Sequence, residues 1–160
     1  MTAFLRYAAA LTLLLAVAAP APVFAFGSND SSSSSSSSST ADLFTKAEKK
    51  VKAEQYADAI PMLEKVIKQD PKNANALNYL GYSYRKTGHP DKALGFYQQA
   101  LAINPNHRGA NEYLGELYLE LKQLDKAQER LNVLSTACNG CEEYVELKEK
   151  VEAFKSGQSS

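Results

Sequence analysis

Apolar and small residues between positions 41 and 155 recur with a period of 34 residues. Three consecutive windows, beginning at Thr40, Ala74 and Arg108, show this repeat. The positions that recur are Ala59, Ala93 and Ala127; Leu63, Tyr97 and Leu131; Pro71 and Pro105; Leu80-Gly81 and Leu114-Gly115; and Tyr84 and Tyr118. A fixed period of this length is typical of a stacked array of structural repeats.

Each window predicts two helices joined by a turn. Alanines and glycines at shared offsets would let the two helices approach closely, with tyrosines and leucines filling the space around them. Pro71 and Pro105 predict the end of the second helix in their windows, because proline cannot continue a helix. Asp91 and Asp125 lie near the expected start of second helices, where a carboxylate is favourable. Pro61 conflicts with this pattern unless it lies in the first turn of its helix; elsewhere it should bend the helix.

The windows resemble the tetratricopeptide repeat, a pair of antiparallel helices. The second window matches through Leu77, Leu80, Gly81, Tyr84, Ala93, Tyr97, Ala100 and Pro105. The third keeps Leu114, Gly115, Tyr118 and Ala127, and the first is weaker, with Leu43, Ala47, Ala59, Leu63 and Pro71. The resemblance implies an all-α fold: a right-handed α-α superhelix, or solenoid, of three helix pairs. The repeats would cover about 40–73, 74–107 and 108–141 of one domain, 41–155.

A further helix is expected over about 142–155, before a disordered tail at 156–160. Tyr144, Leu147, Val151 and Phe154 recur at spacings of three and four and form one apolar stripe among charged residues. A repeat array needs its open end covered, so this stripe predicts a capping helix, with a docking surface for a partner as the alternative.

The N-terminus has the layout of a secretory signal peptide over residues 1–25. Arg6 precedes a largely apolar run, Ala8 to Ala19, which is too short for a membrane-spanning helix of about 20 residues. Val23-Phe24-Ala25 suits signal peptidase and would leave Phe26 as the first mature residue, without a lipid-modified cysteine. We therefore expect an exported protein of the periplasm or the extracellular space, with no membrane insertion after cleavage.

Nine consecutive serines dominate residues 26–40, which we expect to be a disordered, flexible linker, because serines bury too little apolar surface to offset the entropy of ordering. The chain has 18 basic and 18 acidic residues. Such a balance offers no basic excess for nucleic acid.

Cys138 and Cys141 are the only cysteines, and Asn139-Gly140 between them is a strong turn dipeptide. In an oxidising compartment a disulfide is the expected state of such a pair. An exchangeable redox pair and a Cu(I) site completed by His107 remain alternatives. Glu142 stands where a haem-attachment motif needs histidine, and no metal or other cofactor is expected.

The family resemblance implies that a protein or peptide binds along the concave face formed by the first helix of each pair. Asparagine and tyrosine there can hydrogen-bond a peptide backbone, and Arg85 can pair with a carboxylate. The lysine and asparagine arrangement with which some members bind a C-terminal carboxylate is not reproduced. The candidate binding residues are Phe44, Asn75, Asn78, Tyr82, Arg85, Glu112 and Glu116.

No catalytic constellation is recognisable, so an enzyme is not expected. Glu112, Glu116 and Glu120 share one helix face, which is commonly a solvated acidic face. The predicted function is an exported scaffold that binds a protein or peptide through its groove. The alternative is a redox or copper-handling accessory protein that uses the cysteine pair, and self-association is a third possibility.

Overall fold

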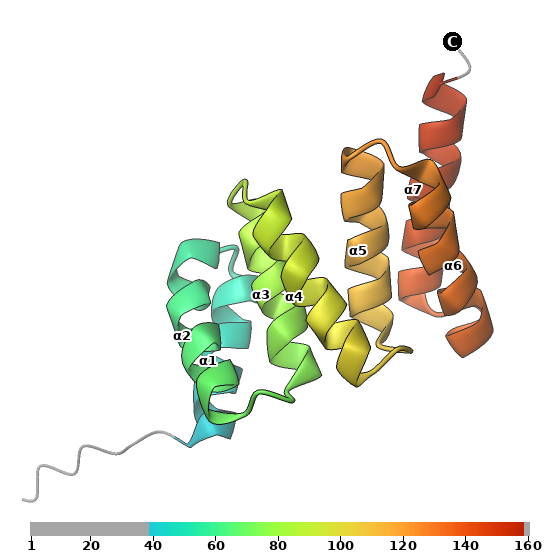
Figure 1. Ribbon diagram of the computed structural model, residues 1–160. Helices are drawn as coiled ribbons and strands as arrows, with labels where there is room; N and C mark the ends of the chain where they lie inside the picture. Colours follow the sequence, from blue (N-terminus) through green and yellow to red (C-terminus); the bar gives the residue numbers. More distant parts are fainter. Residues whose placement is uncertain (1–38, 159–160) are drawn as a thin grey trace, which may run out of the picture. The chain divides into compact units, whose positions relative to one another are not determined.

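The computed structural model describes residues 39–158; the predicted signal peptide and nearly all of the predicted serine-rich linker lie outside this range. Within it the chain forms seven α-helices and no β-strand (Figure 1). The helices are α1 (Thr40–Lys52), α2 (Tyr56–Gln69), α3 (Ala74–Lys86), α4 (Pro90–Ile103), α5 (Arg108–Glu120), α6 (Leu124–Cys138) and α7 (Glu142–Gln158).

The helices pack as consecutive antiparallel neighbours, in agreement with the predicted repeats. α1 packs on α2, α3 on α4 and α5 on α6, and each pair contacts the next. The first helices of the pairs also contact one another in order, and α7 continues their row by packing on α5. We call the surface formed by α1, α3, α5 and α7 the first-helix face. The predicted all-α repeat solenoid is thereby confirmed.

The turn inside each repeat reverses the chain through one residue in the left-handed region. These residues are Glu54, Gly88 and Lys122, at the same repeat offset, with φ of 58°, 80° and 58°. In each turn the next two N–H groups after the cap bond back to carbonyls of the last helical turn, as in Glu54 N to Val51 O at 2.9 Å. Only the second repeat uses glycine, which adopts this conformation without steric cost.

The start of each first helix is capped by a side chain at another shared offset. Ser39, Asn73 and His107 accept hydrogen bonds from the N–H groups three residues further on, at 3.1, 3.0 and 3.1 Å. Ser39 and Thr40, which we expected in the disordered linker, therefore belong to the start of α1. Their assignment to the linker was wrong because the last serine of the run serves as a helix cap.

Cys141 occupies the same offset before α7, and its carbonyl accepts the N–H of Val145 at 3.1 Å. Its sulfur is bonded to that of Cys138 in the structure, with an S–S distance of 2.08 Å. In the earlier repeats the residue at the offset of Cys138 closes the turn with a side-chain acceptor instead: Asp70 Oδ1 accepts from Lys72 N and Asn104 Oδ1 from Asn106 N. The covalent bond thus stands where the other turns use a hydrogen bond.

Two glycines allow bulky side chains to reach the helix backbone. A Cβ atom at Gly81 would lie 2.6 Å from ring atoms of Tyr97 in α4. A Cβ atom at Gly115 would lie 2.5 Å from a methyl group of Leu147 in α7. Leu147 and Val151 are fully buried against α5 and α6, so α7 covers the end of the stack as predicted.

Two sequence expectations need correction. α7 runs to Gln158, so residues 156–158 are helical rather than part of a disordered tail. Pro61 lies in the second turn of α2, beyond the first turn in which we expected it to be tolerated. The helix nevertheless continues for eight residues after it, because only the carbonyl of Ala57 loses its donor while Leu63 and Val66 remain fully buried.

Candidate functional site

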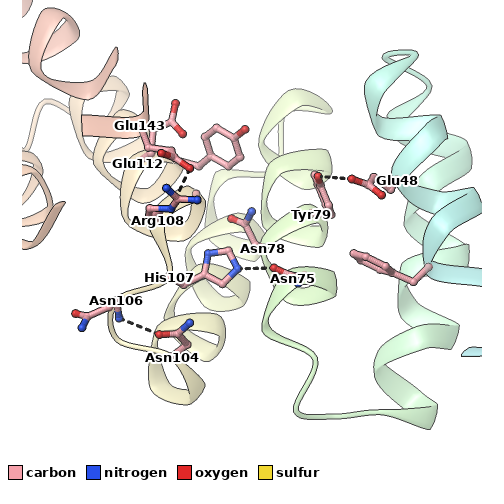
Figure 2. Close-up of a pocket in the computed structure, with 13 residues that line it drawn as sticks. Glu48, Asn75, Asn78, Tyr79, Asn104, Asn106, His107, Arg108, Glu112 and Glu143 are labelled. Atoms are coloured by element: carbon pink, nitrogen blue, oxygen red, sulfur yellow. Dashed lines mark hydrogen bonds and ion pairs between the residues drawn. The ribbon is translucent and has the colours of Figure 1, made fainter. Parts of the chain in front are cut away.

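A pocket of about 470 Å³ opens on the first-helix face (Figure 2). α1, α3, α5 and α7 each contribute to it, together with the turn that precedes α5. The lining residues are Phe44, Glu48, Asn75, Asn78, Tyr79, Asn104, Asn106, His107, Arg108, Gly109, Glu112, Tyr113 and Glu143. The pocket therefore crosses all three repeats and the capping helix.

Four of the seven candidate binding residues line this pocket. They are Phe44 from α1, Asn75 and Asn78 from α3, and Glu112 from α5. The other three, Tyr82, Arg85 and Glu116, lie elsewhere on α3 and α5, where Arg85 contacts both Tyr82 and Glu116. The structure thus brings together the candidates nearest the start of each first helix.

Arg85 has its partners within the chain. Its guanidinium binds Glu116 and Glu120, the latter at 2.9 Å, and only 5% of its side chain is exposed. The same group lies over the ring of Tyr82, 5.5 Å from the centroid. In this structure Arg85 is therefore engaged within the chain, and its pairing with a carboxylate of a bound partner stays a prediction. Glu116 and Glu120, expected on a solvated face, are the groups that hold it.

Tyr82 belongs to an aromatic row rather than to the pocket. Its ring centroid lies 5.7 Å from that of Tyr56 and 4.6 Å from that of Tyr113. Aromatic pairs at these separations stabilise by about 0.5–1.5 kcal/mol beyond area burial. Tyr113 is shared between the row and the pocket wall, so the row fixes one side of the pocket.

Glu112 is the buried acid of the site, with 4% of its surface exposed. Carboxylate oxygens of Glu112, Glu116 and Glu146 lie within 4.8 Å of one another. Burial, the charge of Glu116 and a hydrogen bond with Glu146 raise the pKa of Glu112 to about 8. Glu116 is bound by both Arg85 and Lys150. The cluster is therefore an internal network in which Glu112 is protonated at neutral pH.

His107 is held in one neutral tautomer at the base of the pocket. Its Nδ1 accepts the N–H of Ala110 at 3.1 Å, which leaves the proton on Nε2 to be donated to Asn75 Oδ1 at 2.9 Å. Burial lowers the pKa of His107, in agreement with the neutral form. Both ring nitrogens are used, so His107 does not provide the third ligand that the Cu(I) alternative required.

Asn78 lines the pocket with a side chain that is almost fully buried. Its side chain is 5% exposed, and its Oδ1 has no hydrogen-bond donor among the described residues. Gly109 lies directly against it: a Cβ atom there would be 3.1 Å from Asn78 Nδ2. A buried acceptor without a donor costs about 1–3 kcal/mol. Because this oxygen is buried, a ligand donor would reach it only if the Asn78 side chain turned.

Several lining residues were missed by sequence reasoning. Tyr79 and Tyr113 share a repeat offset and lie one turn after Asn75 and Gly109, so the periodicity contained the signal. Another group comes from the turn before α5, from the first residue of α5 and from α7. Our prediction considered only positions further along the first helices. This group comprises Asn104, Asn106, His107, Arg108 and Glu143.

A family model described as anaphase-promoting complex, cyclosome, subunit 3 matches residues 52–134, more than half of the chain. Together with the repeat geometry, this match shows that the chain belongs to the tetratricopeptide repeat family.

Curated relatives match shorter stretches. The uncharacterized protein ycf37 of Pyropia yezoensis is 46% identical over 55 residues, which cover 34% of this chain and 31% of that protein. The probable UDP-N-acetylglucosamine–peptide N-acetylglucosaminyltransferase SPINDLY of Hordeum vulgare is 35% identical over 63 residues, 39% of this chain and 7% of that protein. The chain thus spans about a third of the first relative and far less of the second.

Solved structures share the fold over about three quarters of the chain. The first repeat domain of Spaghetti (RPAP3) bound to the HSP90 peptide SRMEEVD has a TM-score of 0.67 and 19% identity; the alignment covers 76% of this chain and 94% of that one. The Yersinia enterocolitica type III secretion chaperone SycD, in complex with a peptide of the translocator YopD, has a TM-score of 0.62 and 18% identity. That alignment covers 72% of this chain and 88% of that one. At these identities the likeness concerns the fold.

No helix between residues 40 and 158 combines the length and the apolar character needed to cross a bilayer.

Proposed function

We propose that this chain is an exported scaffold that binds an extended segment of a protein partner in the pocket on the first-helix face. The observation that carries the proposal is a pocket built from every first helix and α7 and lined by amide, aromatic and carboxyl side chains. A peptide backbone offers N–H donors and C=O acceptors with which amide side chains of this kind form hydrogen bonds. The RPAP3 and SycD structures, which are complexes with peptides, support the same use of the fold.

Export is the second part of the proposal and rests on the sequence of residues 1–25, with Arg6 before its apolar run and a cleavage site after Ala25. Expression of the full chain in a bacterial host, followed by fractionation and N-terminal sequencing, tests it. Phe26 as the first residue of exported material is the expected result, and an uncleaved cytoplasmic chain would contradict it.

Peptide binding is tested by filling the pocket. Gly109→Leu places a side chain against Asn78, whereas Gly95→Leu adds the same atoms on α4, where a Cβ atom meets nothing within 4 Å. Peptides selected from a displayed random library on the wild-type domain should lose affinity for the Gly109 variant and keep it for the Gly95 variant. Circular dichroism establishes that both variants are folded. Unchanged binding by folded Gly109→Leu would refute a ligand in this pocket.

A further inference from the structure

The ionisable side chains around the pocket are mostly carboxyl groups. Glu48, Glu112 and Glu143 come from α1, α5 and α7, three different walls of the pocket. Among the described lining residues, Arg108 is the one cation, and its Nε already lies 3.5 Å from a carboxylate oxygen of Glu143. His107 adds no charge at neutral pH, since its tautomer is fixed and burial lowers its pKa.

Aromatic rings lie between these acids. Phe44 and Tyr79 pack with their centroids 5.9 Å apart, and the Tyr79 hydroxyl donates to Glu48 at 3.1 Å. Tyr113 lines the pocket beside Glu112. Ring faces attract cations through their quadrupole, and carboxylates form short, strong hydrogen bonds with guanidinium and ammonium groups.

Resting on the proposed function, we infer that the pocket selects a cationic side chain, that of an arginine or lysine, within the segment it binds. Asn75 and Asn78 provide amide groups for the backbone of that segment, while the acids and rings receive its charged side chain. Glu48 remains ionised, because the hydrogen bond from Lys52 lowers its pKa. Lys52 lies at the surface, where its ion pair with Glu48 is screened and is readily replaced by a ligand cation.

The same arrangement disfavours acidic segments. Two cations, Arg85 and Lys150, lie nearest the cluster of Glu112, Glu116 and Glu146. Both are bound to Glu116, and neither lines the pocket. An acidic peptide such as the SRMEEVD of the RPAP3 complex would meet Glu48 and Glu143 and no unpaired cation among the described lining residues. Charge complementarity therefore separates this pocket from one that receives an acidic C-terminus.

A bound cation should also displace a proton. Glu112 is protonated at neutral pH because burial and Glu116 raise its pKa to about 8. A positive charge beside this carboxyl group favours its ionised form, so its proton passes to the buffer as the ligand binds. Proton release on binding is a signature that a neutral ligand would not produce.

The test uses three acetylated and amidated heptapeptides that differ only at the central residue: arginine, its neutral isostere citrulline, or glutamate. Isothermal titration calorimetry on the domain should show the arginine peptide binding about tenfold more tightly than the citrulline peptide, the gain typical of a charge-assisted hydrogen bond. The glutamate peptide should bind most weakly. Equal affinities for arginine and citrulline, or tighter binding of glutamate, would overturn the inference and leave the proposed function standing. Failure of all three peptides to bind would count against both.

Variants locate the effect in the pocket. Glu48→Gln and Glu143→Gln should each weaken the arginine peptide about tenfold and weaken the citrulline peptide less. Glu149→Gln, the same substitution at an exposed position of α7 outside this pocket, is the matched control. At pH 7.5, the wild-type enthalpy should differ between phosphate and Tris buffers, and Glu112→Gln should abolish that difference. A response of the control equal to that of the pocket variants, or wild-type enthalpies that do not depend on the buffer, would refute the assignment.

Discussion

Adding one methyl group at Gly81 tests the close packing of α3 on α4. A Cβ atom there would lie 2.6 Å from Cδ1 and Cε1 of Tyr97, far inside ordinary contact distance. Tyr97 is fully buried, so its ring has no open space into which to move. Gly95, in the middle of α4, is the matched control, because a Cβ atom there meets nothing within 4 Å.

The expected sign follows from two opposing contributions. Replacing glycine by alanine inside a helix stabilises by about 1 kcal/mol, and both positions gain this amount. Overpacking a filled core costs about 1–3 kcal/mol, and only Gly81 incurs this cost. We therefore expect Gly95→Ala to raise the free energy of unfolding by about 1 kcal/mol and Gly81→Ala to lower it by about 1 kcal/mol.

Urea denaturation of both variants, followed by circular dichroism, measures this difference directly. Because the helix-propensity contribution is common to the two substitutions, their difference reports the steric cost at Gly81 alone. If Gly81→Ala proved as stable as Gly95→Ala, Tyr97 would not be packed against the α3 backbone, and the interpretation of this glycine would be refuted.

Four further predictions concern turns, caps and buried acids. Lys122→Gly should raise the free energy of unfolding in urea by about 0.5–1 kcal/mol, because its φ of 58° strains a residue with a Cβ atom. The wild-type protein should lose stability on acidification from pH 7.5 to 5, as measured by urea melts. His107→Asn should remove this loss, while the asparagine side chain still caps the helix. Glu112→Gln should remove a loss of stability between pH 5 and 8, whose slope is at most about 1.4 kcal/mol per pH unit. Exchanging both Cys138 and Cys141 for serine should cost about 2 kcal/mol by the loop-entropy model, and a thiol assay on native protein should find no free sulfhydryl.

The signs of the two pH effects follow from proton binding. Burial places the pKa of His107 below 6.5, so the folded state binds fewer protons than the unfolded state, and stability is lost as the pH falls from 6.5 through the folded pKa. The pKa of Glu112 is raised from 4.5 to about 8, so the folded state binds more protons, and stability is lost as the pH rises through this interval. Both explanations would be contradicted if the free energy of unfolding depended on pH in the same way in the wild type and in the variants.

The other two predictions have equally direct tests. Gly88→Ala serves as the inverse of the Lys122 substitution and should destabilise, since Gly88 has a φ of 80°. Stabilisation by Gly88→Ala would argue against left-handed turns in the repeats. Two titratable sulfhydryls in unreduced protein would contradict the disulfide, and loss of peptide binding in the double cysteine variant would favour a role for the pair in the site.

The repeat period predicted the helices well because each boundary has a local cause. Pro71 and Pro105 lie just after α2 and α4, and small residues at shared offsets mark where helices touch. Errors arose where one residue has two possible roles. Ser39 continues a run of serines yet caps α1, and Pro61 breaks one hydrogen bond in a helix that its neighbours' burial maintains.

The site was predicted only in part because its polar residues form ion pairs and hydrogen bonds with residues of other helices. Arg85 reads as a ligand-binding cation when α3 is considered alone, and Glu116 reads as a solvated acid when α5 is considered alone. Their ion pair joins residues 31 positions apart, so it depends on the distance between neighbouring helices. The contribution of Glu143 likewise depends on how α7 lies on α5.

Each helix of this stack contacts only those one or two places away along the chain, from α1 with α2 and α3 to α5 with α6 and α7. Unfolding of the helices at one end therefore removes no direct contact of the helices at the other end. Melting of α1 and α2 would leave the apolar cluster around Leu134 and Leu147 intact, so the molecule is expected to fray inward from its ends. The pocket would be the first feature lost, because residues of both α1 and α7 line it. A tightly bound ligand would contact both ends of the stack and stabilise them together.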